Sequence, residues 1–162
     1  MSEAAAPLEI KLMENRKQLE ELLRLRWSES NILIRGQFVR PHEVVAFGAF
    51  CNGRLHGLVT MQPDGKVLYL VALNSFSQMR GVGISLLQAA IDFGRQQGMA
   101  FLRAIVSNDN LVGMRFYQKR GFRIVAFHRG IIDAMRNVKP SIPTTGLDGI
   151  PMRDELELEY EL

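Results

Sequence analysis

The stretch VLYLVAL-NSFSQMRGVG-ISLLQAAIDFGRQQ, residues 67–97, decides the fold. Its first seven residues are all apolar or aromatic, which is typical of a central strand buried on both faces. A polar loop with two glycines follows, and from residue 84 apolar side chains recur at helical spacing. The order of strand, glycine loop and helix places the free N–H groups and the partial positive charge of a helix N-terminus just after the loop.

The loop carries the pattern Q-x-x-G-x-G from Gln78 to Gly83. Glycines let the backbone approach a bulky anion closely, and a diphosphate suits a helix N-terminus, where Arg80 adds a full charge. Neither a Walker loop nor a Rossmann loop fits, because no Gly-Lys pair precedes Ser or Thr and Leu86 stands where the third Rossmann glycine is needed. A bare glycine turn that caps a helix is the alternative for this segment alone, and R-x-x-G-x-S from Arg80 is a second alignment of the motif.

Outward from this unit, strands and helices alternate along the chain. We expect one α/β or α+β domain over residues 1–162, built around a mixed sheet. Residues 28–43 are ambiguous apart from a turn at Arg35-Gly36, and Asn52-Gly53 predicts a tight hairpin. The further strands are expected at 8–13, 44–51, 55–62, 101–107, 122–128 and 155–162, and the further helices at 15–27, 110–120 and 131–138.

Length and composition exclude several classes of protein. With 162 residues, 47% hydrophobic and 23% charged, the chain has the composition of one globular domain rather than of a disordered protein. The longest apolar stretch, 44–51, is too short to cross a bilayer, and the first residues lack a signal-peptide pattern. A lone cysteine, Cys51, excludes an internal disulfide and a cysteine-based zinc site. We therefore expect a cytoplasmic protein with no membrane partner and no metal.

The charge is unevenly distributed along the chain. The net charge is +3, but residues 153–162 hold five acidic residues and one basic residue. The first 152 residues therefore hold 19 basic and 12 acidic residues, which suits an anionic ligand. Because the basic residues are scattered rather than gathered in one run, no nucleic-acid partner is expected.

A second motif lies one strand after the glycine loop. It reads N-x-x-G-x-x-x-Y-x-x-x-G-F from Asn110 to Phe122. Together the two motifs resemble the acetyl-CoA-dependent N-acetyltransferase superfamily (GNAT). Leu86-Leu87 stand where the family usually has a leucine pair, which favours Gln78 as the first motif position, and Gly113 departs from the family's usual alanine. The amino-acid sequence from residue 108 to residue 159 is most similar to a bacterial subgroup of the family.

The resemblance implies a GNAT fold, a mostly antiparallel sheet with splayed central strands flanked by helices. It further implies an N-acetyltransferase that moves the acetyl group of acetyl-CoA to a primary amine by direct attack. In this reading Tyr117 is the catalytic acid that protonates the departing thiolate, and a core aromatic is the alternative role. The residues implied to bind acetyl-CoA are Leu70, Val71, Ala72, Leu73, Gln78, Met79, Arg80, Gly81, Val82, Gly83, Ile84, Asn110, Gly113, Phe116 and Tyr117.

The group that deprotonates the amine is not evident from the sequence. The strand at 67–73 has no acid, and Tyr69 stands where related sequences often carry one. The candidate bases are His128, Glu43, His42 and Asp133, each with an ordinary surface or loop role as the alternative. The glutamates of 155–161 are expected to form a solvated sheet face, with a cation-attracting wall beside the acceptor site as the alternative. Without a base, the chain could serve instead as an acyl-CoA-binding sensor or interaction module, and a homodimer is compatible with the sequence.

Overall fold

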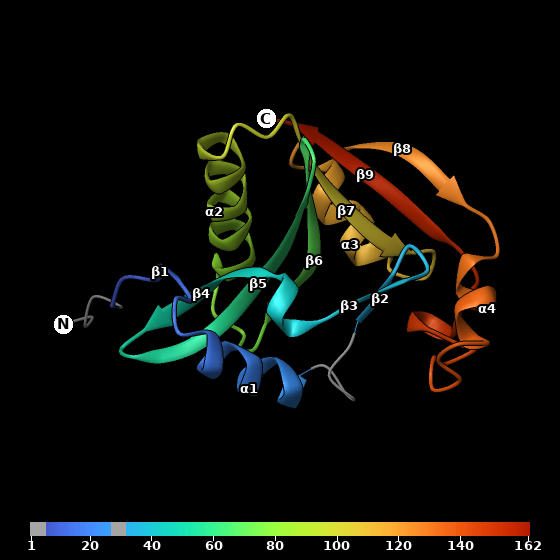
Figure 1. Cartoon of the computed structure of the whole chain (residues 1–162), viewed down its shortest axis with the longest axis horizontal. Coiled ribbons are helices and arrows are strands. Elements are labelled where there is room, and N and C mark those ends of the chain that lie inside the picture. Colours follow the sequence, from blue (N-terminus) through green and yellow to red (C-terminus); the bar gives the residue numbers. More distant parts are fainter. Residues whose placement is uncertain (1–5, 27–31) are drawn as a thin grey trace.

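The computed structural model describes residues 6–26 and 32–162. A seven-stranded sheet runs through these residues in the order β1-β4-β5-β6-β7-β9-β8 (Figure 1). All neighbours pair antiparallel except β6 and β7, which confirms the mixed, mostly antiparallel sheet. The strands of this sheet are β1 (Glu9–Leu12), β4 (Val45–Cys51), β5 (Arg54–Asp64), β6 (Val67–Ser75), β7 (Phe101–Ser107), β8 (Arg123–His128) and β9 (Glu155–Glu161).

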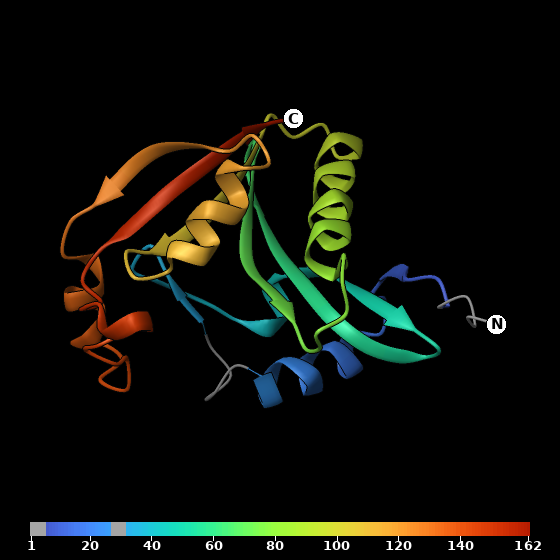
Figure 2. The same ribbon diagram turned by 180° about the vertical axis from the view of Figure 1, so that it is seen from behind.

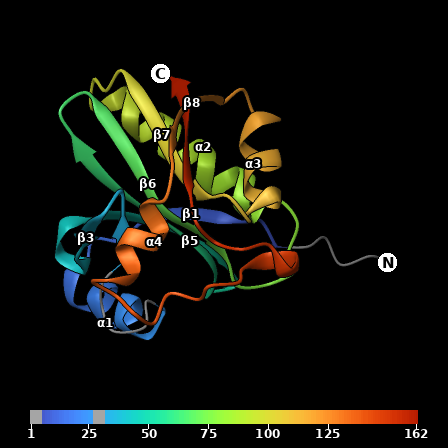
Figure 3. The same ribbon diagram turned by 90° about the vertical axis from the view of Figure 1, so that its right-hand side faces the viewer.

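Helices cover both faces of the sheet. Figure 2 shows α2 and α3 in front of one face, and Figure 3 shows α1, α4 and a small hairpin, β2–β3, on the other side. The bounds are α1 (Arg16–Arg26), α2 (Val82–Gln96), α3 (Leu111–Gln118), α4 (Ile131–Arg136), β2 (Ile32–Ile34), β3 (Gln37–Val39) and the 3-10 turns η2 (Pro41–Glu43) and η3 (Leu147–Gly149). No helix among the described residues is long and apolar enough to cross a membrane.

The central strand β6 contributes to two separate hydrophobic cores. Leu68 and Leu70 pack with α2, β7 and β9 in the larger core, whereas Val71 packs with Leu19 and Leu23 of α1 in the smaller one. The continuous apolar run of β6 therefore reflects burial on both faces, as the sequence predicts.

The two tight turns predicted from the sequence are present. Asn52 and Gly53 both have positive φ, at 50° and 74°, which is the conformation that a two-residue hairpin requires. Arg35 and Gly36 likewise have positive φ and connect β2 to β3. The sequence alone does not predict the two strands of this hairpin, because residues 28–43 are ambiguous apart from the turn. The predicted end of the first helix, at residue 27, lies outside the described residues.

The strands β6 and β7 separate half-way along their length. They pair from Val67 with Phe101 to Leu70 with Ala104, and there the pairing ends, although β6 continues to Ser75 and β7 to Ser107. Over its whole length β7 follows its other neighbour, β9. The backbone of β6 beyond Leu70 is therefore paired with β5 on one side and with no described strand on the other, which confirms the expected splay of the central strands.

Gly57 on β5 lets α2 begin close to the sheet. A Cβ atom at this position would lie 2.7 Å from the backbone oxygen of Asn74, with Val82 of α2 also in the way. We expect Gly57→Ala to lower the free energy of unfolding by about 1–3 kcal/mol, because the crowded backbone cannot move freely. Urea unfolding measures this loss, and Gly83→Ala is the matched control, since its nearest contact would be 3.6 Å from Phe116. Equal stabilities of the two variants would contradict this account of the packing.

Candidate functional site

A cavity of about 460 Å³ opens where β6 and β7 separate. It brings together many of the residues that the sequence singles out, namely Leu70, Val71, Ala72, Leu73, Gly83, Asn110, Gly113, Phe116 and Tyr117. The sequence analysis missed further lining residues, namely Asn74, Ser75, Ile105, Val106 and Val112. The signal that could have found Asn74 and Ser75 was their position directly after the predicted strand, because β6 extends two residues further than expected.

The glycine loop forms one end of this cavity. Gly81 caps α2 in the left-handed conformation, with φ of 85°, and the first backbone bond of the helix runs from the Ser85 N–H to the Gly81 carbonyl. The N–H groups of residues 82–84 therefore have no partner inside the helix. Val82, the first residue of the helix, is only 1% exposed and packs in the larger core. Of the residues from Gln78 to Ile84 that were predicted to bind acetyl-CoA, only Gly83 lines the cavity. The cavity lining does not include Gln78, Met79, Arg80, Gly81, Val82 or Ile84.

One predicted anion donor already has a partner. The backbone N–H of Met79 donates to the Ser77 hydroxyl over 3.3 Å, and that hydroxyl also lies 2.9 Å from Nδ1 of His56. Ser77 thus ties the glycine loop to β5. The remaining predicted N–H donors lie at Arg80 and at the helix start.

The other side of the cavity is built by α3. Asn110 caps this helix, since its Oδ1 accepts a hydrogen bond of 2.9 Å from the Gly113 N–H. A Cβ on Gly113 would lie 2.8 Å from Cγ of Asn110, so glycine leaves room for the cap in its present rotamer. Gly113, where the family usually has alanine, therefore lies directly against the capping side chain of Asn110.

Tyr117 is buried in the cavity wall, with 8% of the residue exposed. Its ring packs edge-on against Phe116 at a centroid distance of 5.3 Å and at a tilt against Phe122 at 5.1 Å. Burial raises the pKa of its phenol to about 12, so the hydroxyl keeps its proton at neutral pH. Its hydroxyl has no hydrogen-bond partner among the described residues, which leaves it available to a bound molecule.

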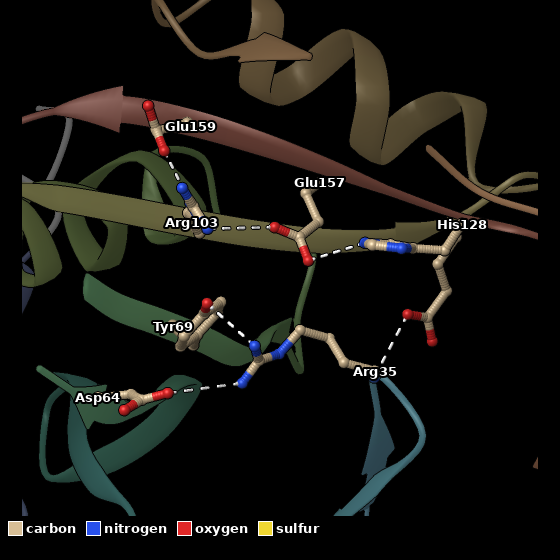
Figure 4. Close-up of polar contacts among 8 residues, drawn as sticks. Arg35, Asp64, Tyr69, Arg103, His128, Glu157 and Glu159 are labelled. Atoms are coloured by element: carbon tan, nitrogen blue, oxygen red, sulfur yellow. Dashed lines mark hydrogen bonds and ion pairs between the residues drawn. The ribbon is translucent and has the colours of Figure 1, made fainter. Parts of the chain in front are cut away.

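The opposite face of the sheet carries a network of charged side chains (Figure 4). Arg103 of β7 pairs with Glu159 at 2.7 Å and with Glu157 at 3.5 Å, and the second oxygen of Glu157 lies 2.9 Å from Nε2 of His128. Arg35 of the small hairpin stacks over the ring of Tyr69 at 3.8 Å and donates to its hydroxyl.

The expectation that the glutamates of β9 form a solvated face is wrong. Glu155 and Glu157 are only 5% and 6% exposed, and Glu161 is the exposed one. The physical reason is that the β2–β3 hairpin brings Arg35 to this face, while β7 and β8 bring Arg103 and His128. Alternation along a strand separates its two faces, but it does not say what covers the polar one.

Known proteins are similar to this chain in sequence and in fold. A model of the acetyltransferase (GNAT) family matches residues 9–122. The chain belongs to this family. It is 30% identical over 139 residues to the uncharacterized protein YdhI of Bacillus subtilis, which covers 85% of this chain and 87% of YdhI.

Solved structures share the GNAT fold. A GNAT family acetyltransferase from Elizabethkingia anophelis with acetyl-CoA bound has a TM-score of 0.73 at 18% identity, covering 96% of this chain and 98% of that one. A Bacillus subtilis acetyltransferase in complex with CoA has a TM-score of 0.70 at 21% identity, covering 96% and 99%. At these identities the likeness establishes the fold.

Of the predicted bases, only His128 lies in the charged network of this GNAT chain. Its partner is Glu157, which is buried. Glu43 accepts a 2.7 Å hydrogen bond from the backbone of Arg40 at an exposed 3-10 turn, and His42 is exposed beside it. Asp133 pairs with Arg136 at the surface of α4. These three are therefore surface residues, the alternative role that the sequence analysis allowed for them.

The raised pKa of Tyr117 predicts a loss of stability at alkaline pH. A tyrosine in the unfolded chain ionises near pH 10, whereas Tyr117 in the folded chain keeps its proton to about 12. Between these values only the unfolded state gains from ionisation, so stability is full below pH 10 and falls as pH rises. The difference between a pKa of 10 and one of about 12 corresponds to a loss of roughly 3 kcal/mol in the free energy of unfolding. Urea unfolding at pH 9 and pH 11 should show a steeper decline for the wild type than for Tyr117→Phe; parallel declines would contradict the shift.

Proposed function

We propose that this chain is an acetyl-CoA-dependent N-acetyltransferase whose acceptor is a primary amine. The observation that carries the proposal is the cavity at the splay, which joins the start of α2, the free edge of β6 and the phenol of Tyr117. Family membership and the CoA-bound structural relatives support acetyl-CoA as the ligand.

The chain offers a separate group to each part of acetyl-CoA. The backbone N–H groups from Arg80 to Ile84, with the Arg80 side chain, suit the diphosphate, because a helix N-terminus favours anions. The backbone of Leu70, Val71, Ala72 and Leu73 can hydrogen-bond the pantetheine arm as an added strand would, and Asn110, Gly113 and Phe116 line the far wall. Acetyl-CoA itself supplies an activated acetyl thioester, and a backbone N–H of β6 can polarise its carbonyl.

Tyr117 acts on the leaving sulfur in this proposal. A thiol has a pKa near ~8.5, so complete transfer of a proton from a phenol with a pKa of about 12 would cost about 5 kcal/mol. The phenol therefore serves first as a hydrogen-bond donor that stabilises the departing thiolate. It delivers the proton as the thiolate leaves and regains one from solvent.

The direct test is release of free CoA thiol from acetyl-CoA in the presence of a panel of primary amines. We expect release that depends on both the amine and the protein, with a stoichiometric N-acetylated amine identified by mass spectrometry. Acetyl-CoA that binds and is not consumed with any amine would overturn the enzyme proposal and favour a sensor or interaction module.

A further inference from the structure

We infer that a second cavity, on the opposite face of the sheet, receives an acceptor amine that carries an apolar group, and that Glu155 pairs with its ammonium and takes its proton. This inference rests on the proposed function and specifies its acceptor. The cavity measures about 260 Å³ and lies between the β2–β3 hairpin, α4 and the start of β9.

The walls of this cavity are mainly apolar. Ile32 and Leu33 come from β2, Ile132 and Met135 from α4, and Ile142 and Met152 from the segment between α4 and β9. Ser107, Glu155 and Lys139 are the polar lining residues. Such walls suit a hydrocarbon or aromatic group, whose burial contributes about 25 cal/mol per Å².

Glu155 differs from the other glutamates on its face of β9. Glu157 and Glu159 pair with Arg103 and His128, but Glu155 has no ion-pair partner among the described residues. Within the described part of the chain, its one hydrogen bond comes from the backbone N–H of Arg35, at 3.4 Å. A carboxylate that is 95% buried costs free energy unless a cation or donor compensates it. The ammonium of a bound amine would supply that compensation.

The second cavity adjoins the first. Ile105 and Val106 of β7 line the cavity at the splay, and the next residue, Ser107, lines the second cavity. Ser107 is also the register partner of Glu155 across the β7–β9 ladder. The end of β7 therefore lines both cavities, and the inference places the amine nitrogen at this end, where it faces the thioester.

Charged groups from the small hairpin, from β8 and from β9 itself act on Glu155. Burial raises its pKa, the Arg35 backbone and the charges of Arg35 and His128 lower it, and Glu157 raises it; the net shift is upward. A raised pKa brings a carboxyl closer to neutral pH, where a general base works best. Lys139 lines the same cavity and has an interaction of its own. An amine with a second positive charge would meet Lys139, so a monoamine is favoured.

In the proposed acetyl transfer, Glu155 and Tyr117 each carry one proton. Glu155 takes one proton from the ammonium, and the neutral nitrogen then attacks the acetyl carbon. The C–N bond forms, the C–S bond breaks, and the thiolate receives a proton from Tyr117. The nitrogen loses its second proton to solvent, which restores Tyr117, and Glu155 releases its own. The sum is one ammonium and one acetyl-CoA converted to one amide, one CoA thiol and one proton.

The test uses 2-phenylethylamine as the probe and Glu155→Gln as the variant. Glu161→Gln, at an exposed position of the same strand, is the matched control. Calorimetric titration of the amine into the CoA-saturated protein should show affinity about 10- to 100-fold weaker in Glu155→Gln, because an ionic hydrogen bond is lost, and unchanged in Glu161→Gln. Both variants should bind acetyl-CoA as the wild type does.

The wild-type chain provides a second test that does not depend on folding of a variant. We expect kcat/KM for 2-phenylethylamine and hexylamine to exceed that for ethanolamine and putrescine by at least about tenfold, from roughly two buried methylene groups. Equal rates with the polar amines, or full amine affinity in Glu155→Gln, would overturn the assignment of Glu155 and its cavity while leaving the acetyltransferase proposal intact. Failure of the wild type to bind acetyl-CoA would overturn both.

Discussion

Gly83→Glu is expected to abolish acetyl-CoA binding. Gly83 lies in the first turn of α2 and lines the cavity at the splay, where a Cβ would already touch the Phe116 ring at 3.6 Å. A glutamate there adds both bulk and a negative charge beside the proposed diphosphate site. Like charges at a contact cost several kcal/mol, so we expect the affinity to fall by more than about 100-fold.

Gly83→Ala separates the effect of charge and bulk from that of losing a glycine. Its added methyl group makes only an ordinary contact, and alanine stabilises a helix relative to glycine. We expect this variant to bind acetyl-CoA within about threefold of the wild type. Isothermal titration calorimetry measures both affinities, and circular dichroism checks the fold. Unchanged binding by Gly83→Glu would contradict the assignment of the glycine loop.

Tyr117→Phe is expected to lower kcat by about 100-fold while acetyl-CoA affinity stays within about twofold of the wild type. General acid assistance typically contributes 10² to 10⁴ in rate. The substitution removes a hydroxyl that has no partner among the described residues and keeps the ring that packs between Phe116 and Phe122. The core and the cavity wall should therefore be preserved.

Steady-state kinetics and a binding titration on the same preparation distinguish the two roles of Tyr117. A parallel loss of affinity and turnover would assign it to the cavity wall, and full turnover would remove it from the chemistry. Phe116→Leu is a suitable comparison, because Phe116 also lines the cavity but has no proton to donate. We expect it to weaken binding more than turnover.

Local patterns predicted much of the fold correctly. The apolar run of β6 and the glycine loop before α2 depend on neighbouring residues in the chain, and both are where the sequence places them. Asn52-Gly53 requires positive φ at two successive residues, which few other pairs adopt readily. The grouping of Gly83 with Tyr117 followed from resemblance to the family, since no local pattern brings the two helices together.

The buried charged face of the sheet could not be predicted in the same way. Glu155, Leu156, Glu157 and Leu158 alternate as they would in a strand with one face in water. Glu155 is covered by Arg35, which is 120 residues away along the chain, and Glu157 is covered by Arg103 and His128. The small hairpin that carries Arg35 has three-residue strands, too short for a clear alternation.

The central claim is that the cavity at the splay of β6 and β7 holds acetyl-CoA, and a crystal structure of the chain with acetyl-CoA tests it most directly. The account predicts the diphosphate within hydrogen-bond distance of the backbone N–H groups at the start of α2, and the thioester sulfur beside the Tyr117 hydroxyl. A diphosphate bound elsewhere, or a sulfur out of reach of Tyr117, would contradict it.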